Sequence, residues 1–243
     1  MTCDFVAITG LAENDRTACF RLSRTSGCNT TRPCRVGELD ATVDACEETY
    51  DVIVVLDQAQ AHRELLAGSL ACWRCSAPLR SWGYARRRSL RLSCGARVWL
   101  RPRRARCRSC TATDVLLPAF APVRSAYTID VVGQALVSSA QGRSHRTIAA
   151  DLGLPDDTVR GWIRKVSGRA EWLRTTATAA AHMFDAMFDP PPPTAAGSPL
   201  AEAISALGGA ATAARRMFGP IATPWELLAV IAQGHLLAPL RSD

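Results

Sequence analysis

Two pairs of cysteines in this 243-residue sequence have the spacing of metal ligands. Cys72 and Cys75 form one C-x2-C pair, and Cys107 and Cys110 form another after residues 76–106. Four thiolates are the ligand set of a closed, tetrahedral zinc site. We therefore predict that these four cysteines bind one structural Zn²⁺ ion.

The segment that carries the cysteine pairs is strongly basic. Residues 71–113 contain twelve arginines and no acidic residue, whereas the whole chain has a net charge of +7 and a pI of about 9.1. Such a block attracts phosphate backbones, although a solvated basic face without a partner has the same composition. The candidate phosphate contacts are Arg86, Arg87, Arg88, Arg101, Arg103, Arg104 and Arg106.

Arginine supplies all but one of the basic residues, since Lys165 is the only lysine. Together with the abundance of alanine, this preference indicates GC-rich coding, as in actinobacteria. Coding bias weakens any argument that each arginine was selected for bidentate phosphate binding.

Strand patterns surround the cysteine pairs. Ser89–Leu92 and Arg97–Leu100 alternate in polarity around Cys94-Gly95, which predicts a hairpin with a tight turn. A strand is also expected at Leu79–Tyr84, so residues 71–118 are predicted to form a zinc ribbon with Cys94 at the hairpin tip, outside the metal site. Residues 51–70 are predicted to lead into it with a strand, 52–56, and a helix, 58–66, capped by Asp57 and followed by Gly68.

A helical pattern begins at Tyr127, and residues 145–164 have the spacing of two short helices around a turn. Ala149 allows close helix packing, Gly153 suits a left-handed turn, and Val159 and Trp162 fall on the inner face of the second helix. This is the pattern of a helix-turn-helix, although ordinary helical cores also contain it. Asp156 is expected to cap the second helix, whose outward-facing candidates for DNA contact are Thr158, Arg160, Gly161, Arg164 and Lys165.

The remaining segments are assigned by composition and period. The helix-turn-helix region is placed at 125–189, with its last helix at Glu171–Phe188, and a proline-rich linker at 190–198. Residues 199–240 are expected to form a helical hairpin, with a capping box at Thr223–Glu226, that is also a candidate homodimer interface. Residues 1–50 hold five cysteines without C-x2-C spacing and are predicted to be disordered or an extension from a start codon assigned too early.

The order of these modules resembles the front end of insertion-sequence transposases with a zinc ribbon. It is closer still to a group of actinobacterial zinc-ribbon/helix-turn-helix proteins of unassigned function. The resemblance is carried by the cysteine pairs and by residues 99–107, 114–118 and 148–155. It implies DNA binding. The transposases continue into a nuclease domain with three metal-binding carboxylates, and no strand pattern after residue 120 predicts such a domain here.

The sequence thus predicts an α+β protein, with a small zinc ribbon followed by helices, that binds double-stranded DNA and is not an enzyme. No catalytic residues are assigned, and the absence of a secretory signal or a bilayer-length apolar run predicts a cytoplasmic location without membrane contact. Two alternatives remain open. One is a truncated or accessory transposase subunit with a separate catalytic partner, and the other is a zinc-ribbon adaptor for protein or RNA.

Overall fold

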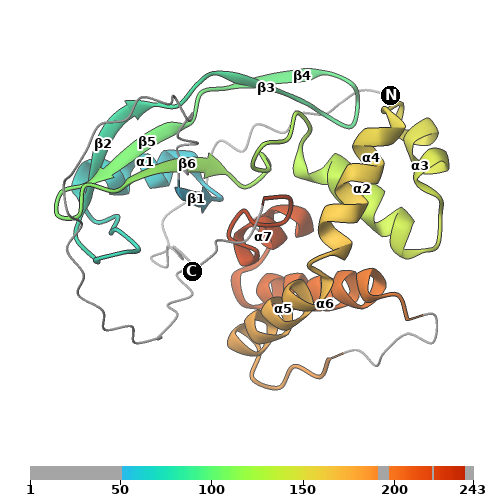
Figure 1. The fold of residues 1–243 in the computed structure, drawn as a ribbon. Coiled ribbons are helices and arrows are strands. Elements are labelled where there is room, and N and C mark those ends of the chain that lie inside the picture. Colours follow the sequence, from blue (N-terminus) through green and yellow to red (C-terminus); the bar gives the residue numbers. More distant parts are fainter. Residues whose placement is uncertain (1–50, 191–196, 221, 239–243) are drawn as a thin grey trace, which may run out of the picture. The chain divides into compact units, whose positions relative to one another are not determined.

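A computed structural model describes residues 51–190, 197–220 and 222–238 of the chain. Within these ranges the strands come first and the helices α2–α7 follow, so the predicted α+β class is confirmed (Figure 1). The strands and the helix between them are β1 (Asp51–Val55), α1 (Gln58–Ala67), β2 (Leu79–Tyr84), β3 (Arg88–Arg91), β4 (Arg97–Leu100), β5 (Arg103–Cys107) and β6 (Thr113–Pro118). The later helices are α2 (Ile129–Ala140), α3 (His145–Leu152), α4 (Asp156–Ser167), α5 (Ala170–Phe184), α6 (Pro199–Phe218) and α7 (Pro224–Ile231).

Four strands form one mixed sheet in the order β1-β6-β5-β2. β5 is antiparallel to both of its neighbours, whereas β1 is parallel to β6 and pairs Val55 with Pro118. Helix α1 follows β1 and begins the connection that leads to the other strands of the sheet. Its ends are capped as predicted, because the Asp57 side chain accepts from two backbone N–H groups at the start and Gly68 has a φ of 71° at the end. The sequence treated β1 and α1 as a lead-in to the ribbon, but the structure makes β1 an edge strand of the same sheet.

The apolar composition of β6 explains this difference. Leu116 and Leu117 are both nearly buried, with Leu116 toward the core beneath α1 and Leu117 in a separate cluster with Leu90 and Leu100. A strand that is buried on both faces needs a neighbour along each edge for its backbone hydrogen bonds, and β1 supplies the second one.

The predicted hairpin is β3–β4, a separate two-stranded sheet. Gly95 takes the left-handed conformation at its turn, with a φ of 83°. The inner face carries Leu90, which is fully buried. The backbone of Arg91 holds the hairpin against the chain before α2, because its N–H donates to the Ala126 carbonyl at 2.8 Å and its carbonyl accepts from Thr128 at 3.1 Å.

Helices α2, α3 and α4 surround a single apolar core. Gly153 ends α3 in the left-handed conformation with a φ of 61°, and Ala149 is buried where the helices meet, as the sequence predicted. The predicted inner face of α4 is also confirmed, because Val159 is fully buried and Trp162 is 6 % exposed. The ring of Trp162 meets that of Tyr127 edge-on at a centroid distance of 5.3 Å.

Helices α5, α6 and α7 differ from the prediction in two respects. Helix α5 ends at Phe184 rather than Phe188, because Asp185 stops it by accepting from the N–H groups of Met187 and Phe188. The sequence paired α6 with α7, and these helices do pack together, but α6 also packs closely along α5 (Figure 1). Alanines make this close approach of α5 and α6 feasible, namely Ala177, Ala180, Ala181, Ala206, Ala210 and Ala213.

The start of α7 agrees with the prediction in detail. Thr223 and Glu226 form a reciprocal capping box, and Pro224 occupies the first turn. The predictions for residues 1–50 and for most of the proline-rich linker lie outside the described residues. Across the described ranges, no helix has the length and apolar character required to cross a membrane.

Two helical glycines give a matched test of the helical packing. A Cβ at Gly133 of α2 would overlap the Trp225 indole of α7, whereas a Cβ at Gly161 of α4 would meet nothing within 4 Å. Gly133→Ala is therefore expected to lower the free energy of unfolding by about 1–3 kcal/mol through overpacking. Gly161→Ala is expected to raise it by roughly 0.5–1 kcal/mol through helix propensity. Denaturant titrations of the two variants check this, and equal effects would contradict the packing of α2 against α7.

Candidate metal centre and nucleic-acid interface

The two cysteine pairs lie in backbone turns of the same form. In the first, the Cys72 N–H donates to the carbonyl of Ala77 at 2.8 Å, and Ser76 has a φ of 59°. In the second, the Cys107 N–H donates to the carbonyl of Ala112 at 2.9 Å, and Thr111 has a φ of 62°. In each turn the backbone N–H of the first cysteine donates to the carbonyl of the residue five positions later, and the residue four positions later has a left-handed backbone conformation. A non-glycine residue rarely takes that conformation, so its recurrence at equivalent positions indicates two built knuckles.

The four predicted ligands come together in space. Their sulfur atoms all lie within 4.8 Å of one another, with Cys72 and Cys110 at 3.6 Å and Cys75 and Cys107 at 3.4 Å. Zn–S bonds of about 2.3 Å in a tetrahedron place sulfurs about 3.8 Å apart, which matches this cluster. Cys72 and Cys107 are buried, whereas Cys75 and Cys110 are exposed. The four cysteines therefore fit a structural zinc site, and the ion would be held by thiolate from both knuckles.

The thiols of the cluster differ in how easily they ionise. Burial raises the pKa of the Cys72 thiol to about 12. Burial acts in the same direction on Cys107, but hydrogen bonds from the backbone of Cys110 and Ser109, and from the Cys75 thiol, lower its pKa to about 6. The Cys107 thiol therefore ionises more readily than the Cys72 thiol, while four thiolates this close would repel one another. A divalent cation is the group that allows all four to ionise together.

The sheet holds both knuckles in place. Cys107 ends β5 and pairs with Leu79 of β2, and Cys72, Leu79 and Cys107 share the apolar cluster beneath α1. The Trp73 indole N–H also donates to the buried carboxylate of Asp114 in β6 at 3.2 Å. The fifth cysteine of the described residues, Cys94, lies at the hairpin turn outside the cluster, as expected.

The predicted phosphate contacts of the ribbon differ in exposure. Arg86, Arg87 and Arg101 are exposed, whereas the other four are half-buried. Arg88 has an internal role, since it donates to the Pro122 carbonyl at 2.8 Å and burial lowers its pKa. The others include guanidinium groups stacked on aromatic rings, with Arg101 and Arg103 over Tyr84, Arg87 over Trp99, and Arg106 over Trp82.

The predicted contacts of the helix-turn-helix share one helix, α4. Its inner face is formed by Val159, Trp162 and Val166, which are buried. On its other faces the residues predicted to contact DNA are exposed or half-buried, namely Thr158, Arg160, Gly161, Arg164 and Lys165. The exposed guanidinium of Arg160 pairs with Asp157 at 2.7 Å.

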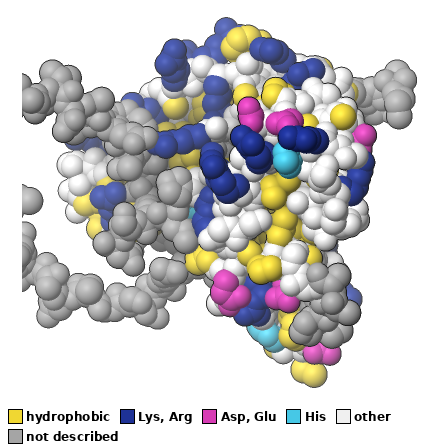
Figure 2. Space-filling model, turned by 45° about the vertical axis from the view of Figure 1, so that its right-hand side comes forward, with side chains coloured by type: hydrophobic (Ala, Val, Ile, Leu, Met, Phe, Trp, Pro, Cys, Tyr) yellow, Lys and Arg dark blue, Asp and Glu magenta, His cyan; other side chains and the backbone are white. Residues whose placement is uncertain are grey.

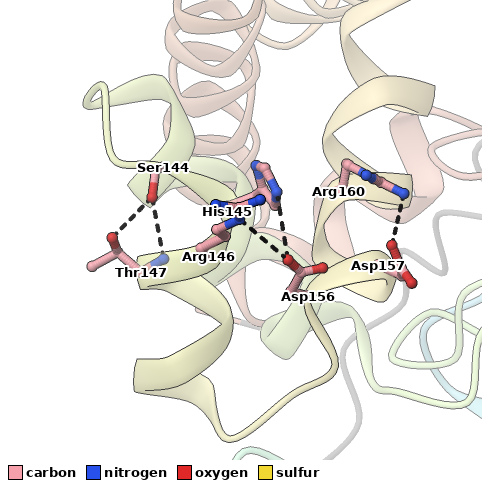
Figure 3. A network of polar contacts seen from close by, with 7 residues as sticks. All are labelled: Ser144, His145, Arg146, Thr147, Asp156, Asp157 and Arg160. Carbon is pink, nitrogen blue, oxygen red and sulfur yellow. Dashed lines mark hydrogen bonds and ion pairs between the residues drawn. The ribbon is translucent and has the colours of Figure 1, made fainter.

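The prediction that Asp156 caps α4 is wrong. Pro155 holds the N-cap position, and Asp156 lies within the first turn of α4. Its carboxylate faces back to α3, where Nε2 of His145 and Nε of Arg146 both lie 3.7 Å from Oδ2 (Figure 3). The capping residue in this region is Ser144, which accepts from the Thr147 N–H at the start of α3. Asp156 therefore links the two helices of the motif.

The hairpin and the helix-turn-helix line a common cavity of about 250 Å³. Arg91 ends β3 and Gly95 lies in the hairpin turn, Tyr127 and Val131 flank the start of α2, and Leu152 ends α3. The sequence motifs assign these elements to separate modules. The motifs themselves gave no sign of this contact, because it depends on two backbone hydrogen bonds of Arg91.

The exposed tryptophans of the ribbon are a further feature that the motifs do not predict. Trp82 and Trp99 are 44 % and 59 % exposed, and each has a guanidinium within about 5 Å of its ring centroid. A signal was present in the alternation of the strands, because a large aromatic residue and arginine recur two positions apart at Arg80-Ser81-Trp82 and Arg97-Val98-Trp99.

Comparison with known proteins identifies one matching family model. It is described as a domain of unknown function, DUF6431, and it matches residues 72–162. No curated protein and no solved structure matches the chain. The matched segment begins at the first cysteine of the cluster and ends at Trp162, so it includes all four cysteines and the turn of the helix-turn-helix.

The metal centre is tested with a pair of cysteine variants. Wild-type protein is expected to contain one zinc per chain by elemental analysis. Cys107→Ser should lose the metal and unfold the ribbon, because thiolate–zinc bonds contribute on the order of 10 kcal/mol to the folding of small zinc domains. Cys94→Ser is the matched control and should retain full zinc. Full occupancy in Cys107→Ser, or metal-free wild-type protein, would contradict the assignment.

Proposed function

We propose that this protein binds double-stranded DNA in a sequence-specific manner, with α4 in the major groove and a structural zinc ribbon beside it. The observation that carries the proposal is the division of α4 into two faces. Val159 and Trp162 anchor one face, while Arg160, Arg164 and Lys165 are presented to solvent on the other. A second helix with a buried face and exposed basic side chains is how a helix-turn-helix docks into a groove.

The charges at the start of α4 support this proposal. Asp156 and Asp157 would repel a DNA backbone if their carboxylates were unpaired. Each carboxylate instead faces basic groups, His145 and Arg146 for Asp156 and Arg160 for Asp157 (Figure 3). These are exposed pairs that contribute little to stability, so their main effect is on the local electrostatic field.

The resemblance to the front end of zinc-ribbon transposases points in the same direction, toward a transposase-like or regulatory DNA-binding protein. We propose binding without catalysis. Several carboxylates of the later helices have local structural partners, since Glu171 pairs with Arg174, Asp185 with Arg216, and Glu226 belongs to the capping box. An accessory transposase subunit would differ by supporting metal-dependent DNA cleavage together with a catalytic partner.

The first test concerns sequence reading by α4. Arg160→Ala is expected to weaken the free energy of binding by about 1–3 kcal/mol on a duplex selected from a random pool, and by little on a scrambled duplex. The reason is that arginine can form hydrogen bonds with two acceptors of one guanine. Asp157→Asn should leave this specificity intact and strengthen binding to both duplexes, since it removes a negative charge near phosphate.

Val159→Ala is the packing control for this experiment. It should lower the free energy of unfolding by about 1–3 kcal/mol without a selective loss of the preferred duplex. If Arg160→Ala weakens both duplexes equally, the residue contacts phosphate and sequence is read elsewhere. If it changes neither affinity, the helix pair is a core element and the proposal for α4 fails.

The second test concerns phosphate contacts of the ribbon. Arg86 and Arg101 are both exposed, and 71–113 contains no acidic residue. Replacing both by alanine should weaken binding to all duplexes alike and flatten the dependence of log K on log salt by roughly one unit per lost phosphate contact. An unchanged slope would show that these arginines form a solvated face without a DNA contact.

A further inference from the structure

The ribbon exposes aromatic side chains in an unusual setting. Trp82 is 44 % exposed and Trp99 is 59 % exposed, although side chains of this size are usually well covered. Guanidinium groups lie over both rings, with Arg87 at 4.4 Å from the Trp99 centroid and Arg80 and Arg106 at 5.2 and 4.6 Å from the Trp82 centroid. Such cation–π pairs hold the indole rings in place and leave much of each residue open to solvent.

Like charges lie directly opposite each other beside both tryptophans. In the β3–β4 hairpin Arg91 pairs with Arg97, and in the β2–β5 pair Arg80 faces Arg106. Opposed like charges destabilise a strand pair, and residues 71–113, which contain both arginine pairs, include no acidic side chain to offset them. An anionic ligand would supply the missing negative charge.

The β3–β4 hairpin places Arg91, Arg97 and Trp99 on one face. Leu90 and Leu100 point into the core, so the alternation of each strand directs Arg91, Arg97 and Trp99 to the opposite, exposed face. In Figure 2, dark-blue Lys and Arg side chains alternate with yellow hydrophobic ones along the upper edge of the molecule, the region of β3 and β4 in Figure 1. We use the name arginine–tryptophan surface for two groups of side chains, one on the hairpin and its approach (Arg87, Arg91, Arg97 and Trp99) and one on the β2–β5 pair (Arg80, Trp82 and Arg106).

We propose that the arginine–tryptophan surface binds single-stranded DNA, with the indole rings stacking on unpaired bases and the guanidinium groups contacting the phosphates. An exposed ring gains little from duplex DNA, whose base faces are already stacked, whereas an unpaired base offers a free π-face. Positive charge alone would suit any polyanion, but positive charge interleaved with exposed tryptophan suits a strand with accessible bases. This activity goes beyond the proposed function, since it depends on the exposed tryptophans of the ribbon and does not involve α4.

The test uses the full-length protein and a fluorescein-labelled 12-nucleotide oligo(dT), with binding followed by anisotropy at fixed salt. Trp99→Ala and Trp82→Ala are each expected to weaken oligo(dT) binding by about 5- to 150-fold, the range for loss of one stacked base. Trp99→Phe retains an aromatic face and should remain within about threefold of wild type. Met217→Ala is the matched control, because Met217 is similarly exposed at 57 % but belongs to α6, and it should bind like wild type.

A 20-base-pair duplex is measured in parallel. Trp99→Ala should leave duplex affinity unchanged, while Arg160→Ala should leave oligo(dT) affinity unchanged, so the two proposals fail independently. The inference is overturned if wild-type protein does not bind oligo(dT) at low salt, or if both tryptophan variants bind it like wild type. It is also overturned if Trp99→Ala weakens duplex and oligo(dT) equally, because the surface would then be a general polyanion site. Circular dichroism confirms that each variant is folded.

Discussion

The position of four sulfur atoms is the constraint on which the rest of this structure depends. Cys72 lies in the knuckle that precedes β2 and Cys107 ends β5, and both form part of the small apolar core beneath α1. That core contains few large side chains, so hydrophobic burial alone gives the ribbon limited stability. Metal ligation would close one end of the strand pair and leave the other end to continue into the β3–β4 hairpin. The hairpin in turn is hydrogen-bonded through Arg91 to the chain just before α2, so it connects the strand pair that carries the knuckles with the helical region.

Charge is distributed unevenly between the ribbon and the helix-turn-helix. Residues 71–113 contain twelve arginines and no acidic residue, whereas the helix-turn-helix contains side chains of both charges and pairs its acidic ones locally, as with Asp157 and Arg160. A uniformly positive ribbon produces long-range attraction that is strongly screened by salt, and a balanced helix produces short-range selectivity. The two elements would thus contribute different parts of a nucleic-acid interaction, the first to capture and the second to discrimination.

Sequence analysis located most of the secondary structure because the local signals were strong. The knuckle spacing, Gly95 in the hairpin turn, Gly153 after α3 and the capping box at Thr223 each act within a few residues, and each was found. The parallel pairing of β1 with β6 was missed because it joins residues more than 60 positions apart and leaves no periodic trace. The role of Asp156 was predicted wrongly because two acids stand at the start of α4, and only the distances to His145 and Arg146 show which partner each carboxylate takes. The DNA contacts, which no comparison with a known structure supports, stay predictions.

The β3–β4 hairpin is attached to the chain before α2 by two backbone hydrogen bonds of Arg91. Its N–H donates to the Ala126 carbonyl, and its carbonyl accepts from the Thr128 N–H. Any residue except proline offers the same two groups. The side chain at position 91 can therefore change during evolution without loosening the attachment of the ribbon to the helical region. A substitution at this position would therefore change the exposed chemistry of the hairpin without changing how the hairpin is attached to the helices.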